Sequence, residues 1–413
     1  LYGWTFAKWT MAASAIGVVC GLIGTMFHFG VHEVTAFRGT HPWVLYLLPL
    51  AGFVIVSFYK LTETDGLGTD DIIDAVHEGK RLPILLLPAI FFGTVLTHLC
   101  GGSAGREGAA LQMGGTIGQC MGRTFRLDDR DLRVATLAGM AAFFSALFGT
   151  PLAATVFAIM VISIGVLYHV ALYPSLLAAL VAYGVSVRLG VEPTRFTVAV
   201  PDQSVGMFVR VAALGVLCAL VSILFCKLMH GAGHLMKRIK NPWLRVICGG
   251  FAVIALTWVF GTDYNGAGMD IVTRAIEQET VAVPWAFLLK LVFTAVTLAA
   301  GFKGGEVVPS FFVGATFGCA VSPLLGLPVG FGAAVGLAAV FCGVTNCPVA
   351  STLLAVELFG AEGMLYFALA CCLSYMLSGY QGLYSSQTIL YSKLKAQFIN
   401  VHTNAYHAGE KTE

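Results

Sequence analysis

Long apolar segments with little charge between them constrain this 413-residue chain more than any other feature of its sequence. Hydrophobic residues make up 57% of it and charged residues only 11%, against about 25% charged residues in an ordinary soluble domain. Such a chain lacks the polar surface that a water-soluble protein of this size needs. The sequence therefore predicts a multi-pass integral membrane protein whose first helix, near 11–31, is retained. The net charge of +2 is too small to indicate a nucleic-acid-binding surface.

The apolar segments are broken in a way that predicts short and interrupted helices. Several are shorter than the roughly 20 residues that a helix needs to cross a bilayer. Glycine, proline or charge interrupts the sequence at 101–108 (GGSAGREG) and at 301–309 (GFKGGEVVP). Broken helices are tolerated at membrane depth only where they face protein or a polar cavity. We therefore expect an all-α polytopic membrane protein with tilted and broken helices.

The two breaks belong to an internal repeat. Gly101, Gly105, Gly114, Thr116 and Gly118 match, at a shift of 200 (301 minus 101), Gly301, Gly305, Gly314, Thr316 and Gly318. Further along, GMAAF at 139–143 matches GLAAV at 336–340 at a shift of 197 (336 minus 139). Interrupted helices at corresponding places in two halves are typical of transporters with an ion site between the repeats. We expect a first transmembrane repeat over 1–190, a second over 191–392 and a polar C-terminal tail over 393–413.

Ionisable residues stand at the start of the helix that follows each break. Arg106 and Glu107 follow the first break, and Lys303 and Glu306 lie in the second. Because helix starts carry unpaired N–H groups and roughly half a positive charge, two of them facing each other form an anion site without a fixed cation. A carboxylate there acts as a tethered anion, and its protonation allows a diffusing anion to replace it. Such an exchange couples anion movement to proton movement.

These segments resemble the motifs of the CLC chloride channels and proton-coupled antiporters. GREG at 105–108, GGEVVP at 304–309, GLG at 66–68 and GLYS at 382–385 occur in that family's order. The resemblance implies a CLC fold with two inverted-topology repeats, a homodimer with one pore per subunit, and a place in the bacterial inner (plasma) membrane. It also implies that Glu107 is the external gating glutamate and that the Tyr384 hydroxyl donates to the central anion.

The resemblance and the two helix starts together give a set of candidate site residues. We expect Glu107 and Glu306 to serve gating and proton transfer. The expected anion-binding residues are Leu67, Gly68, Arg106, Gly108, Val307, Val308 and Tyr384. The expected partners are an inorganic anion, fluoride or chloride, with protons and the lipid bilayer; no cofactor, metal or nucleic acid is expected.

Three departures from the chloride-handling members favour fluoride. Leu67 stands where those members usually have serine, and the position of their inner proton-transfer glutamate falls on or next to Met160–Val161. Glu306 is an acid where they generally have an apolar residue. The fluoride-exporting branch of the family resembles the chain in each respect, although it typically has methionine at the position of Leu67 and threonine at that of Val308. We therefore expect fluoride/proton antiport, with a chloride channel or chloride/proton antiporter of the same fold as the alternative.

Each candidate also has a purely structural interpretation. Glu107 could cap its helix, Glu306 could cap a helix or pair with Lys303, and Tyr384 could belong to an interfacial aromatic belt. For Glu357 we favour a structural polar contact. We expect the acidic run at 63–74 to form a solvated loop and helix start.

The remaining reactive residue types do not form a recognisable catalytic or metal site. The pairs His28/His32 and His230/His234 are spaced i, i+4 but lack a clear third ligand, so we expect solvated interface residues. The cysteines have no regular spacing and are expected to be small packing residues. An intramembrane enzyme would need a catalytic constellation facing a cavity, and we find none, so the chain is not expected to be an enzyme.

Overall fold

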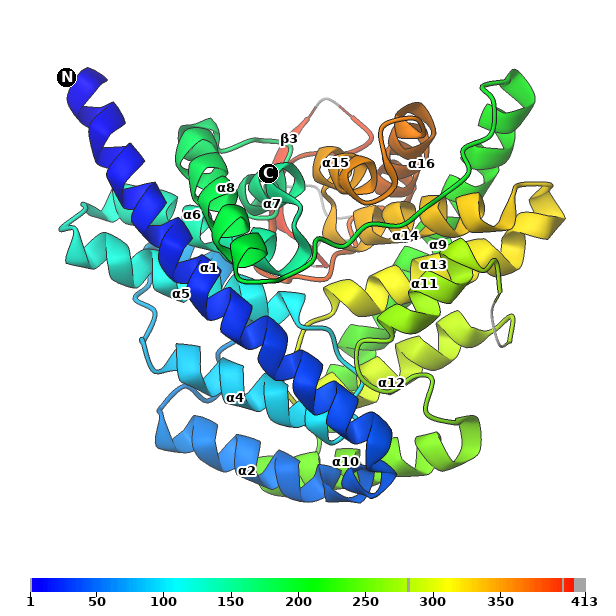
Figure 1. Ribbon diagram of the computed structural model, residues 1–413, viewed down its shortest axis with the longest axis horizontal. Helices are drawn as coiled ribbons and strands as arrows, with labels where there is room; N and C mark the ends of the chain where they lie inside the picture. Colours follow the sequence, from blue (N-terminus) through cyan, green and yellow to red (C-terminus); the bar gives the residue numbers. More distant parts are fainter. Residues whose placement is uncertain (1, 281–282, 396, 405–413) are drawn as a thin grey trace.

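The computed structural model describes residues 2–280, 283–395 and 397–404, and its regular structure is almost entirely helical (Figure 1). The first half of the chain forms α1 (Tyr2–Thr40), α2 (Leu48–Leu61), α3 (Thr69–Glu78), α4 (Leu86–Leu99), α5 (Glu107–Thr124), α6 (Asp129–Phe148), α7 (Pro151–Met160) and α8 (Leu172–Arg188). Two short 3-10 helices, η1 (Pro42–Leu47) and η2 (His169–Ala171), precede α2 and α8. The predicted helical membrane fold is confirmed.

The second half of the chain repeats the same series of helices in the same order. It forms α9 (Val205–Met236), α10 (Pro242–Phe260), α11 (Met269–Glu277), α12 (Ala286–Ala300), α13 (Val307–Leu325), α14 (Val329–Thr345), α15 (Pro348–Phe359) and α16 (Met364–Leu377). The packing is repeated as well, because α5 packs on α6 as α13 packs on α14, and α1 packs on α8 as α9 packs on α16.

Contacts between the halves join equivalent helices. α2 packs on α10, which lies beside it at the bottom of Figure 1, and α7 packs on α15. α5 and α13 also touch each other. Elements that lie near a pseudo-two-fold axis meet their own equivalents, so these contacts agree with two repeats related by such an axis. The proposed boundary at 190/191 falls in the segment between the end of α8 and the start of α9 and stays a prediction.

Glycines allow the central helix pairs to approach closely. An added Cβ at Gly139 of α6 would lie 2.0 Å from the carbonyl oxygen of Gly114 in α5, and one at Gly118 would lie 2.1 Å from that of Ala135. In the second half, an added Cβ at Gly314 of α13 would lie 2.4 Å from the carbonyl oxygen of Gly336 in α14. Small residues let membrane helices pack backbone to backbone. The repeated glycine pattern of the sequence is therefore a pattern of helix contacts.

Side chains and prolines fix where several helices begin. Asp128 accepts a hydrogen bond from the N–H of Asp131 (2.8 Å) at the start of α6, and Ser204 caps α9 in the same way. Pro151 and Pro348 stand at the first positions of the equivalent helices α7 and α15. Capping oxygens satisfy N–H groups that have no partner within the helix, and proline has no N–H to satisfy.

Within the described residues, 7 helical segments are long and apolar enough to cross a membrane. They comprise α1, the η1–α2 segment, α6, the η2–α8 segment, α9, α10 and α13. The apolar helices α4, α7, α12, α14, α15 and α16 are shorter. This mixture agrees with the short and interrupted helices that the sequence predicts.

A small sheet is present that the all-α prediction did not include. β1 (Ser163–Ile164) pairs in parallel with β2 (Thr388–Tyr391), which pairs antiparallel with β3 (Phe398–His402). Ile164, Ile389 and Ile399 pack together and are buried. β3 lies within the segment expected to be a polar tail, and the rest of that tail, 405–413, lies outside the described residues. The sheet attaches the C-terminal segment to the end of α7.

Candidate functional site

The starts of α5 and α13 meet at an antiparallel bridge between two glycines. Gly105 donates its N–H to the carbonyl of Gly305 (2.7 Å), and Gly305 donates to the carbonyl of Gly105 (2.8 Å). An added Cβ at Gly305 would lie 2.2 Å from the backbone nitrogen of Gly108, so only glycine fits there. The two breaks predicted from the sequence are therefore in direct contact, and the positive ends of two helices converge at one place.

Glu107 lies at this place and is almost fully buried, with 1% of its surface exposed. One carboxylate oxygen, Oε2, accepts the backbone N–H of Arg106 (2.9 Å), and Oε1 accepts from the Arg106 Nε (3.3 Å). The carboxylate therefore folds back on the start of its own helix. This geometry is both that of a cap and that of a tethered anion held by a helix start.

Glu306 reaches the same region from the second half of the chain. It is half-buried and directly precedes α13. An added Cβ at Gly108 would lie 3.4 Å from the Glu306 Oε2, so this carboxylate approaches the first turn of α5. Lys303 does not hold it, because the Lys303 ammonium lies 4.1 Å from the centre of the Tyr59 ring and forms no ion pair with Glu306 in the described residues. The pairing that we considered from the sequence is not made.

Tyr384 presents a hydroxyl to the interior of the protein. The residue is buried, with 3% of its surface exposed, and its Oη has no hydrogen-bond partner among the described residues. Its backbone carbonyl accepts from the Thr403 Oγ1 (2.5 Å) and from the Gln387 N–H (3.2 Å), which fix the turn. Tyr384 is therefore an interior residue, and an interfacial aromatic belt does not describe it.

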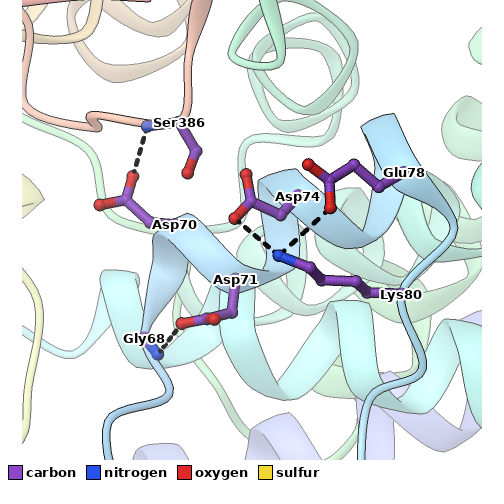
Figure 2. Close-up of polar contacts among 7 residues, drawn as sticks. All are labelled: Gly68, Asp70, Asp71, Asp74, Glu78, Lys80 and Ser386. Carbon is purple, nitrogen blue, oxygen red and sulfur yellow. Dashed lines mark hydrogen bonds and ion pairs between the residues drawn. The ribbon is translucent and has the colours of Figure 1, made fainter.

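The start of α3 is fastened to the turn that carries Tyr384. Asp70 accepts a hydrogen bond from the backbone N–H of Ser386 (3.0 Å), and Asp71 accepts one from that of Gly68 (2.9 Å), as Figure 2 shows. A diffusing anion would compete with Asp71 for the Gly68 N–H. Leu67, one residue earlier, is half-buried and packs against the core.

The acidic run is only partly the solvated segment that the sequence predicts. Glu63 and Asp65 are exposed, as expected. Asp74 pairs with Lys80 (3.4 Å), an exposed lysine that also contacts Glu78 (3.2 Å; Figure 2). Asp70 and Asp71, in contrast, make the two specific hydrogen bonds described above. Sequence reasoning missed both contacts. The contact of Asp70 joins residues 316 positions apart along the chain, whereas that of Asp71 is a local cap at the start of α3.

The first turn of α13 contributes backbone and apolar side chains. Val307 and Val308 are buried. The Cβ of Val308 lies 3.0 Å from the place of an added Cβ at Gly105, so its side chain covers the glycine bridge. The first N–H groups of a helix have no partner within the helix. Since valine has no hydroxyl, only the backbone of these two residues can donate to an anion.

Arg106 connects the site to α1, a contact that sequence reasoning missed. The Arg106 Nη1 lies 3.0 Å from the Nδ1 of His28. His28 was expected to be a solvated interface residue, and this expectation is wrong because α1 crosses over the start of α5. His32, one turn further along α1, is exposed as predicted. The i, i+4 spacing of the two histidines marked the helix face but could not identify its partner.

The other histidines and Glu357 have structural positions. His234 is exposed, whereas His230 lies 3.4 Å from the Ser385 hydroxyl, beside the Tyr384 turn. In the part of the chain that the structure describes, no group of three or more His, Cys, Asp or Glu side chains could hold a metal ion. Glu357 accepts the N–H groups of Leu152 (3.1 Å) and Ala153 (2.8 Å) at the start of α7. The structural contact that we favoured for Glu357 is confirmed.

Met160 borders a cavity of about 490 Å³. It stands on or next to the position where chloride-handling members have their inner proton-transfer glutamate. The described residues that line this cavity include no aspartate or glutamate: Met160, Ser163, Ile164, Gly165, Val166, Leu167, His169, Asn346, Pro348 and Tyr375. Within the described part of the chain, no other segment supplies a carboxylate to this cavity.

Comparison with known proteins gives consistent matches along the chain. A family model described as voltage gated chloride channel matches residues 50–379. A chloride/fluoride channel protein of Pseudomonas syringae pv. tomato is 39% identical over 399 residues, covering 94% of this chain and 88% of that protein. An H(+)/Cl(-) exchange transporter of Vibrio campbellii is 25% identical over 382 residues, covering 84% and 81%. The crystal structure of a CLC-type fluoride/proton antiporter matches with a TM-score of 0.90 at 32% identity, covering 93% of this chain and 98% of that chain.

Proposed function

Because this chain belongs to the voltage-gated chloride channel (CLC) family, we propose that it exports fluoride across the membrane in exchange for protons. It is a multi-pass membrane protein of a family of anion channels and antiporters. Its similarity to a chloride/fluoride channel protein and to a CLC-type fluoride/proton antiporter supports fluoride as the anion. Membership of this family also supports a role in transport and not in catalysis.

The observation that carries the proposal is the position of Glu107 at the meeting point of two helix starts. Its carboxylate accepts hydrogen bonds from the backbone N–H and the Nε of Arg106, as a bound anion would. Protonation removes the negative charge and weakens these bonds, so that a diffusing anion can replace the carboxylate. A proton that enters on Glu107 therefore exchanges for an anion, which is the elementary step of antiport.

We assign the other candidate residues to the path on both sides of Glu107. Glu306 approaches the first turn of α5 and is the second acid that a proton path needs. The proposed anion-binding groups are the Tyr384 hydroxyl, the Arg106 side chain, and the backbone or apolar surface of Leu67, Gly68, Gly108, Val307 and Val308. Fluoride is small and strongly hydrated, so close donors must replace its water. The unpaired N–H groups of α13 and the unpartnered Tyr384 hydroxyl are donors of this kind.

The assembly and the location are proposed from the family. We place the protein as a homodimer with one pore per subunit in the bacterial inner (plasma) membrane. The bacterial origin of the similar chloride/fluoride channel protein supports this location. Cross-linking or single-molecule photobleaching of the protein in bilayers tests the dimer.

Transport by the purified protein in liposomes tests the function. Vesicles loaded with fluoride and placed in fluoride-free buffer are expected to take up protons as fluoride leaves, and to do so more slowly with chloride. Empty vesicles give the background of permeating hydrogen fluoride. Anion flux without proton movement would establish the channel alternative, and chloride flux faster than fluoride flux would show that the ion is wrongly assigned.

We expect Glu306→Gln to slow fluoride-driven proton uptake by at least about tenfold, because glutamine cannot carry a proton and a positioned proton-transfer group contributes about 100-fold or more. Proton uptake and fluoride efflux are measured in the same vesicles. Glu362→Gln, a change at an exposed loop glutamate, serves as the matched control. Unchanged coupling in Glu306→Gln would leave Glu306 with a structural role only.

A further inference from the structure

We infer that His28 is a positioning residue, which holds the Arg106 guanidinium against the Glu107 carboxylate. The inference rests on the proposed role of Glu107. The three side chains form a row from α1 to α5, with 3.0 Å between the His28 Nδ1 and the Arg106 Nη1 and 3.3 Å between the Arg106 Nε and the Glu107 Oε1. His28 and Arg106 are half-buried and Glu107 is buried, so this row leads from the rim of the protein to the site.

The chemistry of arginine fixes the direction of the first contact. A guanidinium has five N–H donors, no acceptor, and stays protonated in proteins. The His28 Nδ1 must therefore accept the hydrogen bond, so the ring is neutral and its proton is on Nε2. Since the guanidinium is planar and rigid, fixing Nη1 on His28 also fixes the orientation in which Nε points at Glu107.

Among the described residues, His28 is the one side chain of α1 that makes a hydrogen bond with Arg106. The rings that face it are the edge of Phe29 at 5.4 Å and His32 at 6.5 Å between centroids, and the charged group that faces it is Arg106. Neither ring makes a hydrogen bond with Arg106. Removing the His28 acceptor therefore leaves the guanidinium without an anchor on α1.

The expected consequence is that the Glu107 carboxylate blocks the anion path less completely. A guanidinium without its anchor turns away from Glu107 part of the time, and the carboxylate then loses a charge-assisted contact that keeps it on the helix start. Anions can then pass Glu107 even when its carboxylate is not protonated. We therefore expect uncoupled anion leak in His28→Phe, which keeps the size of the ring but has no acceptor, and not in His28→Asn, whose side-chain oxygen can take the place of Nδ1.

Fluoride efflux from liposomes at alkaline pH, where protons are scarce, tests the inference. His28→Phe is expected to raise this leak roughly tenfold, the change that loss of one hydrogen bond to a charged group produces. His28→Asn is expected to restore the wild-type rate. His32→Phe, one helical turn away and with no hydrogen bond to Arg106 among the described residues, is the matched control and is expected to leave the rate unchanged.

The two proposals can fail separately. A wild-type protein that moves fluoride without protons refutes antiport. The positioning role is still supported in that case if His28→Phe leaks faster than the wild type and His28→Asn leaks at the wild-type rate. A His28→Phe protein that elutes as wild type in gel filtration and leaks at the wild-type rate overturns the inference, as does a His28→Asn protein that leaks as fast as His28→Phe.

Discussion

Fluoride-driven proton uptake is expected to fall by at least about 100-fold in Glu107→Gln, because a positioned proton-transfer side chain contributes at least that much. Glutamine has nearly the same shape as glutamate but can neither take up a proton nor act as a tethered anion. The buried carboxylate with its two contacts to Arg106 is then replaced by a neutral amide. Proton uptake and anion efflux, measured together in liposomes, report the change.

Two controls separate this effect from misfolding. Glu362→Gln makes the same chemical change at an exposed loop position and is expected to transport as the wild type does. The elution profile and thermal unfolding of Glu107→Gln in detergent are expected to remain close to those of the wild type. Coupled proton uptake near the wild-type rate in Glu107→Gln would rule out Glu107 as the gating and proton-accepting group.

The second large effect is expected for Gly305→Ala. The added methyl group would lie 2.2 Å from the backbone nitrogen and 2.7 Å from the Cα of Gly108. These are backbone atoms of the opposing helix start and cannot rotate away. The two hydrogen bonds between Gly105 and Gly305 must lengthen or break. Overpacking costs about 1–3 kcal/mol, and each lost hydrogen bond costs about 1 kcal/mol more.

Thermal unfolding in detergent and anion flux in liposomes measure the outcome for Gly305→Ala. We expect a clearly lower unfolding temperature and the loss of coupled transport. Gly184→Ala in α8 is the matched control, because an added Cβ there has no atom within 4 Å and alanine is favoured over glycine within a helix by about 1 kcal/mol. Wild-type unfolding temperature and flux in Gly305→Ala would show that the two helix starts need not touch.

The glycines made much of the fold predictable. Where two backbones approach closely there is no room for a side chain, so a glycine is needed in the sequence at each such contact. The repeated pairs at Gly114 and Gly314 are such contacts, between α5 and α6 and between α13 and α14. The bridge between Gly105 and Gly305 is another. For this reason the internal repeat, the short helices and the two breaks could be predicted without a structure.

The partners of the charged residues were not predictable in the same way. Lys303 lies over the ring of Tyr59 and not beside Glu306, and Arg106 reaches His28 of α1, which is 78 residues away. The sheet that attaches the C-terminal segment to β1 was likewise missed. Long side chains have no fixed spacing along the sequence, so their contacts depend on how distant helices cross.

By itself the sequence determined that the chain lies in lipid, that its helices break at two repeated places, and that carboxylates stand at the helix starts after the breaks. These properties depend on composition and on neighbours along the chain. Only the tertiary structure decided that the two starts touch, that the carboxylate of Glu107 folds onto Arg106, and that His28 holds Arg106 from the side. The strength of an electrostatic contact depends on distance in space, which the folding of distant segments alone fixes.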